Sequence, residues 1–118
     1  MPDLQCLKVK IKDGKTHYAL EWIRGMSERY PDGLNEVLAQ EGMIVETIFV
    51  DHAEDGDYLI VYQRADDLLD AHRNFLDSDH PFDDAIREFV AETWGECKHL
   101  DLLIDHEKTE EGYQHTVG

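Results

Sequence analysis

Hydrophobic and polar residues alternate with the period of a β-strand in two parts of the chain, near its beginning and near residue 100. In residues 4–11 the inward set is Gln5, Leu7, Val9 and Ile11. In residues 97–104 the inward set is Leu100, Leu102 and Ile104, on the same side as Lys98. Alternation of this kind is typical of a strand with one buried face, so we predict the first and last strands of a sheet here, with Cys97 and His99 on the outer face.

Two further strands are predicted in the middle of the chain. Residues 43–50 and 58–62 are rich in β-branched and aromatic residues, and the sequence Glu-Asp-Gly-Asp at residues 54–57 is typical of a turn. The two strands are therefore expected to form a hairpin. Residues 43–50 are apolar on both faces, as in a strand buried on both sides, so the pattern leaves open which face is inward.

Helices are predicted between these strands from apolar positions that recur every three or four residues. Residues 18–30 form the first helix, and Pro-Asp-Gly at residues 31–33 separates it from a short second helix that ends at Gly42. Asp66 and Asp67 begin a third helix, which residues 78–81 interrupt. A fourth helix follows from Pro81 to Gly95.

The predicted order is strand, helix, strand, strand, helix pair and strand, which is the split βαβ plan of the ferredoxin-like fold. We therefore predict the α+β class, with a four-stranded antiparallel sheet and helices on one face only. A chain of 118 residues fits a single domain, assigned to residues 1–106. Residues 107–118 are polar and lack periodicity, so a polar C-terminal tail, either an arm or a frayed end, is expected.

The net charge of the chain limits the kinds of molecule that are expected to bind it. The chain has 27 acidic and 11 basic residues, which gives a formal net charge of −16. Such a surface repels phosphate backbones and anionic lipid headgroups, so neither nucleic acid nor a membrane is an expected partner. The longest apolar stretch, residues 43–50, is far shorter than the roughly 18 residues of a membrane span. The acidity fits either a halophilic host or an ordinary acidic protein, and unfolding at low salt would separate the two.

Residue types that bind metals or form disulfides show no site pattern. Cys6 and Cys97 have no pairing pattern, and none of the seven histidines stands four residues from another. We therefore expect no metal, no cofactor and no disulfide. Residues 1–4 lack the basic and apolar regions of a signal peptide, so a cytoplasmic location is expected.

The face of the predicted sheet that the helices leave uncovered has a mixed composition. By alternation it carries Lys8, Lys10, Tyr58, Tyr62 and Arg64. Aromatic residues mixed with charges are typical of an interface, most simply one with a second copy of the chain. We therefore predict a homodimer through this open face, and a solvated face with a few tyrosines is the alternative.

The order of elements and the uncovered face together resemble the dimeric α/β-barrel superfamily, in which two such sheets pack face to face. The resemblance covers roughly residues 4–106. The sequences Asp-Gly-Asp-Tyr-Leu at residues 55–59 and Ser-Asp-His-Pro at residues 78–81 are also similar to those of a small, functionally uncharacterised family within the superfamily. Members of the superfamily include cofactor-free monooxygenases, haem-degrading monooxygenases, isomerases and stress proteins, so the resemblance implies a fold rather than one activity. Haem degradation is disfavoured because the first strand has no asparagine and only His72 matches the helical histidine of those members.

Histidines supply the candidate catalytic groups. His72 falls on the apolar stripe of the third helix, where it is either a general base that lines a pocket or a core histidine with one hydrogen bond. Asp79 and His80 lie at the interruption between two helices. They either cap the fourth helix or form a pair at the rim of a cavity, in which Asp79 orients His80.

Aromatic residues and one arginine are the candidate ligand contacts. Tyr18 and Trp22 lie one turn apart on the first helix and form either core packing or the apolar wall of the pocket. Tyr58, Tyr62 and Arg64 are expected to supply polar contacts to an anionic or phenolic ligand. Arg64 has the alternative of pairing with one of the many acidic residues.

These features together predict a homodimeric, cytoplasmic α/β barrel with a small apolar pocket between helices and sheet. The pocket is expected to bind a small organic molecule. Turnover by histidine-mediated proton transfer, as in a cofactor-independent monooxygenase or isomerase, is one outcome. The alternative is a non-catalytic, stress-related or regulatory binding module whose cavity is filled by its own side chains.

Overall fold

Four strands form one antiparallel sheet in the computed structural model, which describes residues 3–118. They are β1 (Asp3–Ile11), β2 (Met43–Ala53), β3 (Gly56–Ala65) and β4 (Trp94–His99), in the order β2-β3-β1-β4. The first and fourth strands are therefore neighbours, and β2 and β3 form the predicted hairpin. Met1 and Pro2, on which the expectation of no signal peptide partly depends, lie outside the described residues.

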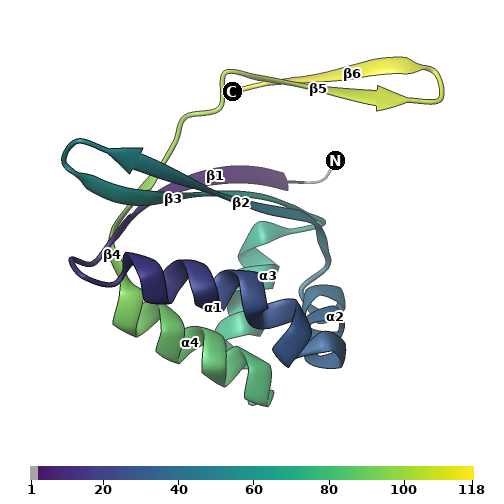
Figure 1. Ribbon diagram of the computed structural model, residues 1–118. Coiled ribbons are helices and arrows are strands. Elements are labelled where there is room, and N and C mark those ends of the chain that lie inside the picture. Colours follow the sequence, from purple (N-terminus) through teal and green to yellow (C-terminus); the bar gives the residue numbers. More distant parts are fainter. Residues whose placement is uncertain (1–2) are drawn as a thin grey trace.

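Four helices cover one face of this sheet (Figure 1). They are α1 (Thr16–Arg29), α2 (Pro31–Gln40), α3 (Leu68–Asp77) and α4 (Pro81–Thr93). Proline is the first residue of both α2 and α4, where its missing N–H removes no helical hydrogen bond. The predicted α+β class and ferredoxin-like plan are confirmed by this arrangement. Among residues 3–118, no helix is long and apolar enough to cross a membrane.

The core lies between the sheet and the helix layer. Its buried residues are Leu7, Val9, Ile11, Ala19, Leu59, Val61 and Phe89. Removal of these apolar side chains from water supplies the main driving force for folding. In β2, whose pattern left the inward face open, Ile48 lies opposite Val61 and so faces the helices. Phe49 lies on the other face of the sheet, with 60% of its surface exposed.

The junction between α4 and β4 differs from its prediction. Thr93 is the last residue of α4 and Trp94 is the first of β4, so no loop residue separates them. The helix was expected to end at Gly95 and the strand to begin at Cys97, so both predicted boundaries are wrong. Trp94 continues the apolar stripe of the helix, and a stripe alone does not show where a helix ends. A tertiary contact coincides with the end, because the backbone N–H of Lys12 donates a 2.8 Å hydrogen bond to the carbonyl of Thr93.

The inward face of β4 is also the opposite of the predicted one. In the register with β1, His99 lies opposite Leu7 and Cys97 lies opposite Val9, which puts both side chains on the helix face. The strand ends at His99, so the predicted inward residues Leu100, Leu102 and Ile104 are not part of it. Alternation shows which residues share a face but not where the strand begins, and the register of β1 and β4 also shifts between Val9 and Ile11.

The C-terminal residues form a hairpin in place of an aperiodic tail. Strands β5 (Ile104–Thr109) and β6 (Gly112–Val117) pair antiparallel, and Gly112 at their turn has a φ of 121°, which favours glycine. Both strands are mostly polar, so the apolar alternation by which the other strands were predicted is missing. Strand β5 begins before residue 107. The division into a domain of residues 1–106 and a tail of residues 107–118 stays a prediction about domains.

Arg64 connects the hairpin to the sheet. Figure 1 shows β5 and β6 on the side of the sheet opposite to the helices. The Arg64 guanidinium forms an ion pair with Asp105 and a second one, of 3.1 Å, with Glu107. Only 12% of the Arg64 side chain is exposed, so these pairs are shielded from solvent more than most surface pairs. Of the two roles considered for Arg64, the structure has the pairing with acidic residues.

Candidate ligand-binding site

A cavity of about 660 Å³ lies between the helix layer and the sheet. Residues from α1 to α4 and from β1 to β4 line it, so it occupies the middle of the two-layer structure. Its aromatic walls are Trp22, Phe75, Phe82, Phe89 and Trp94. The rings of Trp22 and Phe89 stack with centroids 4.3 Å apart, which fixes one wall. The volume is in the range of cavities that hold small organic ligands.

Three polar side chains on neighbouring strands form a hydrogen-bonded row along the cavity. Gln5 of β1 donates a 2.7 Å hydrogen bond from Nε2 to Oε1 of Gln63 in β3, and Gln63 donates one of 2.7 Å from Nε2 to Oε2 of Glu46 in β2. The three residues lie opposite one another in the register and therefore share the helix face. Sequence reasoning missed this row. The sequence feature that could have indicated this row is Gln5, because it is a polar residue in an otherwise apolar set of inward positions.

Glu41 adds a carboxyl group to the cavity. It follows the last residue of α2 and lines the cavity with Glu46. Burial raises the pKa of the Glu41 carboxyl, and the negative charges of Asp83 and Glu46 act in the same direction; together they bring it from 4.5 to about 7. A carboxyl group with such a pKa exchanges its proton near neutral pH, which suits general acid–base chemistry. Sequence reasoning also missed Glu41, because its place at a helix end gave no pattern.

Two buried polar atoms near the cavity have no hydrogen-bond partner among residues 3–118. One is Oδ1 of Asp83 in the first turn of α4, a residue with only 1% of its surface exposed. The other is the indole Nε1 of Trp94, which belongs to the cavity lining. A buried polar group without a partner is costly, so both atoms are places where a bound molecule or water would stabilise the protein.

His72 lines the cavity, as one of its two predicted alternatives requires. The residue is exposed, and so are Leu69 of α3 and His99 of β4, which also belong to the lining. These exposed residues mark where the cavity meets solvent.

Burial raises the pKa of the Cys97 thiol, which also lines the cavity; the thiol therefore stays protonated, and a thiolate nucleophile is disfavoured. Within the described part of the chain, no group of three or more His, Cys, Asp and Glu side chains is placed to hold a metal ion.

The two aromatic residues predicted on α1 have different positions. Trp22 lines the cavity and also packs against the core, so it fits both of its predicted alternatives. Tyr18 is outside the lining, 42% exposed, with its ring centroid 6.3 Å from that of Phe89. Partial burial and the nearby charge of Glu92 raise the pKa of the Tyr18 hydroxyl. Tyr18 therefore supports the wall from outside rather than facing a ligand in the cavity.

Tyr58, Tyr62 and Arg64 lie on the other face of the sheet from the cavity. All three alternate along β3 with Leu59 and Val61, whose side chains face the helices. The Tyr58 hydroxyl donates a 2.6 Å hydrogen bond to Asp55. Their face is the uncovered one on which the alternation of the sequence places them. None of the three belongs to the cavity lining, and a ligand-binding role for them stays a prediction.

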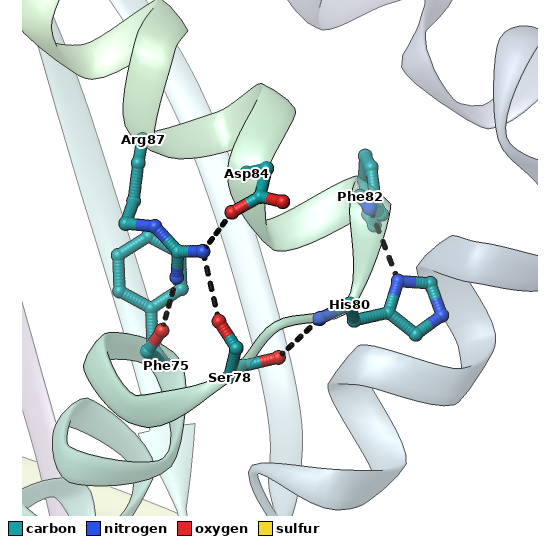
Figure 2. A network of polar contacts seen from close by, with 6 residues as sticks. All are labelled: Phe75, Ser78, His80, Phe82, Asp84 and Arg87. Carbon is teal, nitrogen blue, oxygen red and sulfur yellow. Dashed lines mark hydrogen bonds and ion pairs between the residues drawn. The ribbon is translucent and has the colours of Figure 1, made fainter.

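His80 caps a helix in the structure, in the network of polar contacts that Figure 2 shows at the break between α3 and α4. Its Nδ1 accepts a 3.1 Å hydrogen bond from the backbone N–H of Phe82, and its Nε2 lies 2.9 Å from Oε2 of Glu36 in α2. Glu36, and not the expected Asp79, is thus the acidic partner of His80. Neither His80 nor Asp79 belongs to the cavity lining, and a catalytic role for them stays a prediction.

The same network fixes the angle between α3 and α4. Arg87 of α4 donates hydrogen bonds of 2.6 Å to the carbonyl of Phe75 and 2.8 Å to the carbonyl of Ser78, and it also pairs with Asp84 (Figure 2). The two carbonyls belong to the end of α3, where the last carbonyl groups have no N–H donor within the helix. Ser78 Oγ accepts a 3.1 Å hydrogen bond from the backbone N–H of His80. The break predicted at residues 78–81 is therefore an ordered corner.

The four-stranded antiparallel sheet with helices on one face defines a ferredoxin-like α+β protein, and one solved structure with a TM-score above 0.5 supports this fold. A dimeric protein of unknown function and ferredoxin-like fold from Bacteroides fragilis is similar in structure, with a TM-score of 0.52 and 14% sequence identity. That match covers 82% of this chain and 91% of the other. A candidate antibiotic biosynthesis monooxygenase from Bacillus cereus also matches, with a TM-score of 0.41, 17% identity and coverage of 82% and 86%. Likeness at these identities concerns the fold.

The chain belongs to DUF6176, a family of unknown function whose sequence model matches residues 2–111. The resemblance drawn from the sequence, to a small uncharacterised family with a ferredoxin-like fold, is thereby confirmed. No curated protein matches the chain.

Proposed function

We propose that the protein binds a small organic molecule in the helix–sheet cavity. The observation that carries this proposal is the cavity itself, about 660 Å³ with mostly apolar walls and with Gln5, Gln63, Glu41 and Glu46 as convergent polar groups. Protein interiors are close-packed, and an empty space of this size forfeits many favourable contacts. An occupant would restore those contacts. The unpartnered Nε1 of Trp94 offers such a molecule a hydrogen-bond donor.

Proton transfer on the bound molecule is a second candidate function, which Glu41 and His72 favour. Both residues line the cavity, and the pKa of Glu41, about 7, matches the pH at which a general acid or base works best. A reaction of this kind is that of a cofactor-independent isomerase or monooxygenase. Without it, the protein is a non-catalytic binding module with a stress-related or regulatory role.

We further propose a homodimer through the open face of the sheet. Phe49 of β2 is 60% exposed on that face. A large apolar side chain exposed on a sheet face that no helix covers is a candidate contact for a partner. The Bacteroides fragilis protein of similar fold is dimeric. Native mass spectrometry of the freshly purified protein reports both the subunit count and any retained small molecule.

Filling the cavity tests the binding proposal directly. Ala71 of α3 is 5% exposed and lines the cavity, so Ala71→Phe introduces a ring there, whereas Ala39→Phe places the same ring on the exposed side of α2. We expect Ala71→Phe to abolish uptake of a naphthalene probe measured by fluorescence, and Ala39→Phe to leave it unchanged. His72→Leu is expected to weaken uptake while keeping or raising stability. Equal uptake by wild type, Ala71→Phe and His72→Leu would refute the proposal.

A further inference from the structure

We propose that the ligand of the cavity is an organic amine, with an apolar body and one positively charged amino group that lies beside Glu41 and Glu46. This inference rests on the proposed binding function and deepens it by naming the class of ligand. It depends on the charges around the cavity, on the shape of its apolar walls and on an unpartnered buried oxygen.

The cavity is lined by two acidic residues and by two histidines, His72 and His99. Glu41 and Glu46 line it, and no lysine or arginine of residues 3–118 belongs to the lining. Asp83 is buried in the first turn of α4, outside the cavity lining, and its Oδ1 has no hydrogen-bond partner in the described part of the chain. Asp66 adds a fourth carboxyl group nearby, with Oδ2 3.2 Å from where a Cβ on Gly42 would lie. The protein itself therefore supplies no lysine or arginine in the lining as a counter-charge.

A missing counter-charge is energetically costly in a partly buried site. An ionised carboxylate that leaves water needs a cation or several hydrogen-bond donors. Burial near Asp83 and Glu46 is expected to raise the pKa of Glu41, because the neutral, protonated carboxyl is favoured there up to a higher pH. An ammonium group in the cavity supplies both the positive charge and N–H donors. An anionic ligand, in contrast, meets two carboxyl groups and no lysine or arginine in the lining.

The rest of the cavity suits the body of such a molecule. Aromatic side chains from α1, α3 and α4 form its walls, so an apolar body is buried there with a gain of free energy. Aromatic faces also attract cations, which lowers the cost of bringing an ammonium group into an apolar space. A neutral alcohol would gain the same apolar contacts without the ion pair. Charge is therefore the property that separates the amine from its neutral analogue.

A series of three probes with one body tests this inference. The probes are 1-naphthylmethylamine, 1-naphthylmethanol and 1-naphthoate, which carry a cationic, a neutral and an anionic group on the same ring system. Titration calorimetry at about pH 8 and about 0.5 M NaCl screens the general attraction of a chain with net charge −16 for cations. We expect the amine to bind at least about tenfold more tightly than the alcohol, and the naphthoate to bind not at all.

Substitutions in the cavity then test whether Glu41 and Glu46 cause the preference for the amine. Glu41→Gln, with Glu46→Gln as a second variant if the first is unstable, is expected to weaken amine binding about tenfold and to change alcohol binding less than about twofold. Glu28→Gln, on the exposed side of α1, is the matched control and is expected to change neither. Equal affinity for amine and alcohol, unaffected by Glu41→Gln, would overturn the amine preference and leave the binding function standing. Failure of all three probes to bind, or amine binding that survives Ala71→Phe, would overturn both.

Discussion

Replacement of Glu41 by glutamine is expected to stabilise the protein above neutral pH. The carboxyl group lines a partly buried cavity, and its pKa rises from 4.5 to about 7 on folding, mainly through burial and further through Asp83 and Glu46. The folded state thus holds the proton more tightly than the unfolded chain. Stability is therefore unaffected by this group below about pH 4.5, falls between about pH 4.5 and 7, and stays reduced at higher pH.

The size of the effect follows from the two pKa values. A difference between 4.5 and about 7 corresponds to roughly 3 kcal/mol of penalty on the ionised form if all of it is realised. Glu41 is only half-buried, and solvent screens part of the interaction, so we expect about half of this, near 1.5 kcal/mol. Glutamine has almost the same shape and no charge, so Glu41→Gln removes the penalty. At about pH 5 the gain is expected to shrink to about 0.7 kcal/mol, roughly half of its value at pH 8.

Urea unfolding of wild type and Glu41→Gln at about pH 5 and pH 8, in about 0.5 M NaCl, measures this difference. Glu28→Gln removes one negative charge from an exposed position on α1 and controls for the change in net charge. The reasoning is refuted if Glu41→Gln is no more stable than Glu28→Gln at pH 8. It is equally refuted if the gain in stability is the same at both pH values.

Three further outcomes are expected. Arg64→Met removes the ion pairs that connect the sheet to β5, so amide hydrogen exchange in residues 104–117 should accelerate about tenfold, and unchanged protection would contradict that role. His80→Ala removes the cap of α4 and should cost about 1 kcal/mol in urea unfolding, whereas Asp79→Ala should stay within about 0.5 kcal/mol; equal losses would argue against the cap. An increase from about 0.1 to 1 M NaCl should raise the melting temperature because it screens a net charge of −16, and a flat salt response would count against self-repulsion.

The fold was predictable where hydrophobic periodicity and turn residues agree. In β1 the alternation matches the buried set Leu7, Val9 and Ile11, and the Glu-Asp-Gly-Asp turn joins β2 to β3 as expected. The C-terminal hairpin was not predictable in this way, because its strands are mostly polar and bury little. Ion pairs with Arg64 connect it to the sheet, and such long-range pairs have no signature in local sequence.

The candidate site was predictable only in part, for a related reason. Trp22 and His72 could be placed in the cavity because helical spacing shows which side chains face the sheet. Tyr58 and Arg64 lie on the uncovered face, as alternation predicts, but outside the cavity lining, because alternation along a strand does not show on which side of a sheet a cavity opens. Glu41 was missed since its importance comes from tertiary neighbours, not from its own surroundings in the sequence.

The direct joint between α4 and β4 makes the two elements one mechanical unit. A connecting loop absorbs small changes in the angle of a helix, but Thr93 and Trp94 adjoin, and the hydrogen bond from Lys12 holds their junction to β1. Any shift of α4 must then be accommodated at the edge of the sheet, from which the chain continues into the C-terminal hairpin. A spectroscopic label on β5 or β6 is therefore expected to respond to a change in the position of α4.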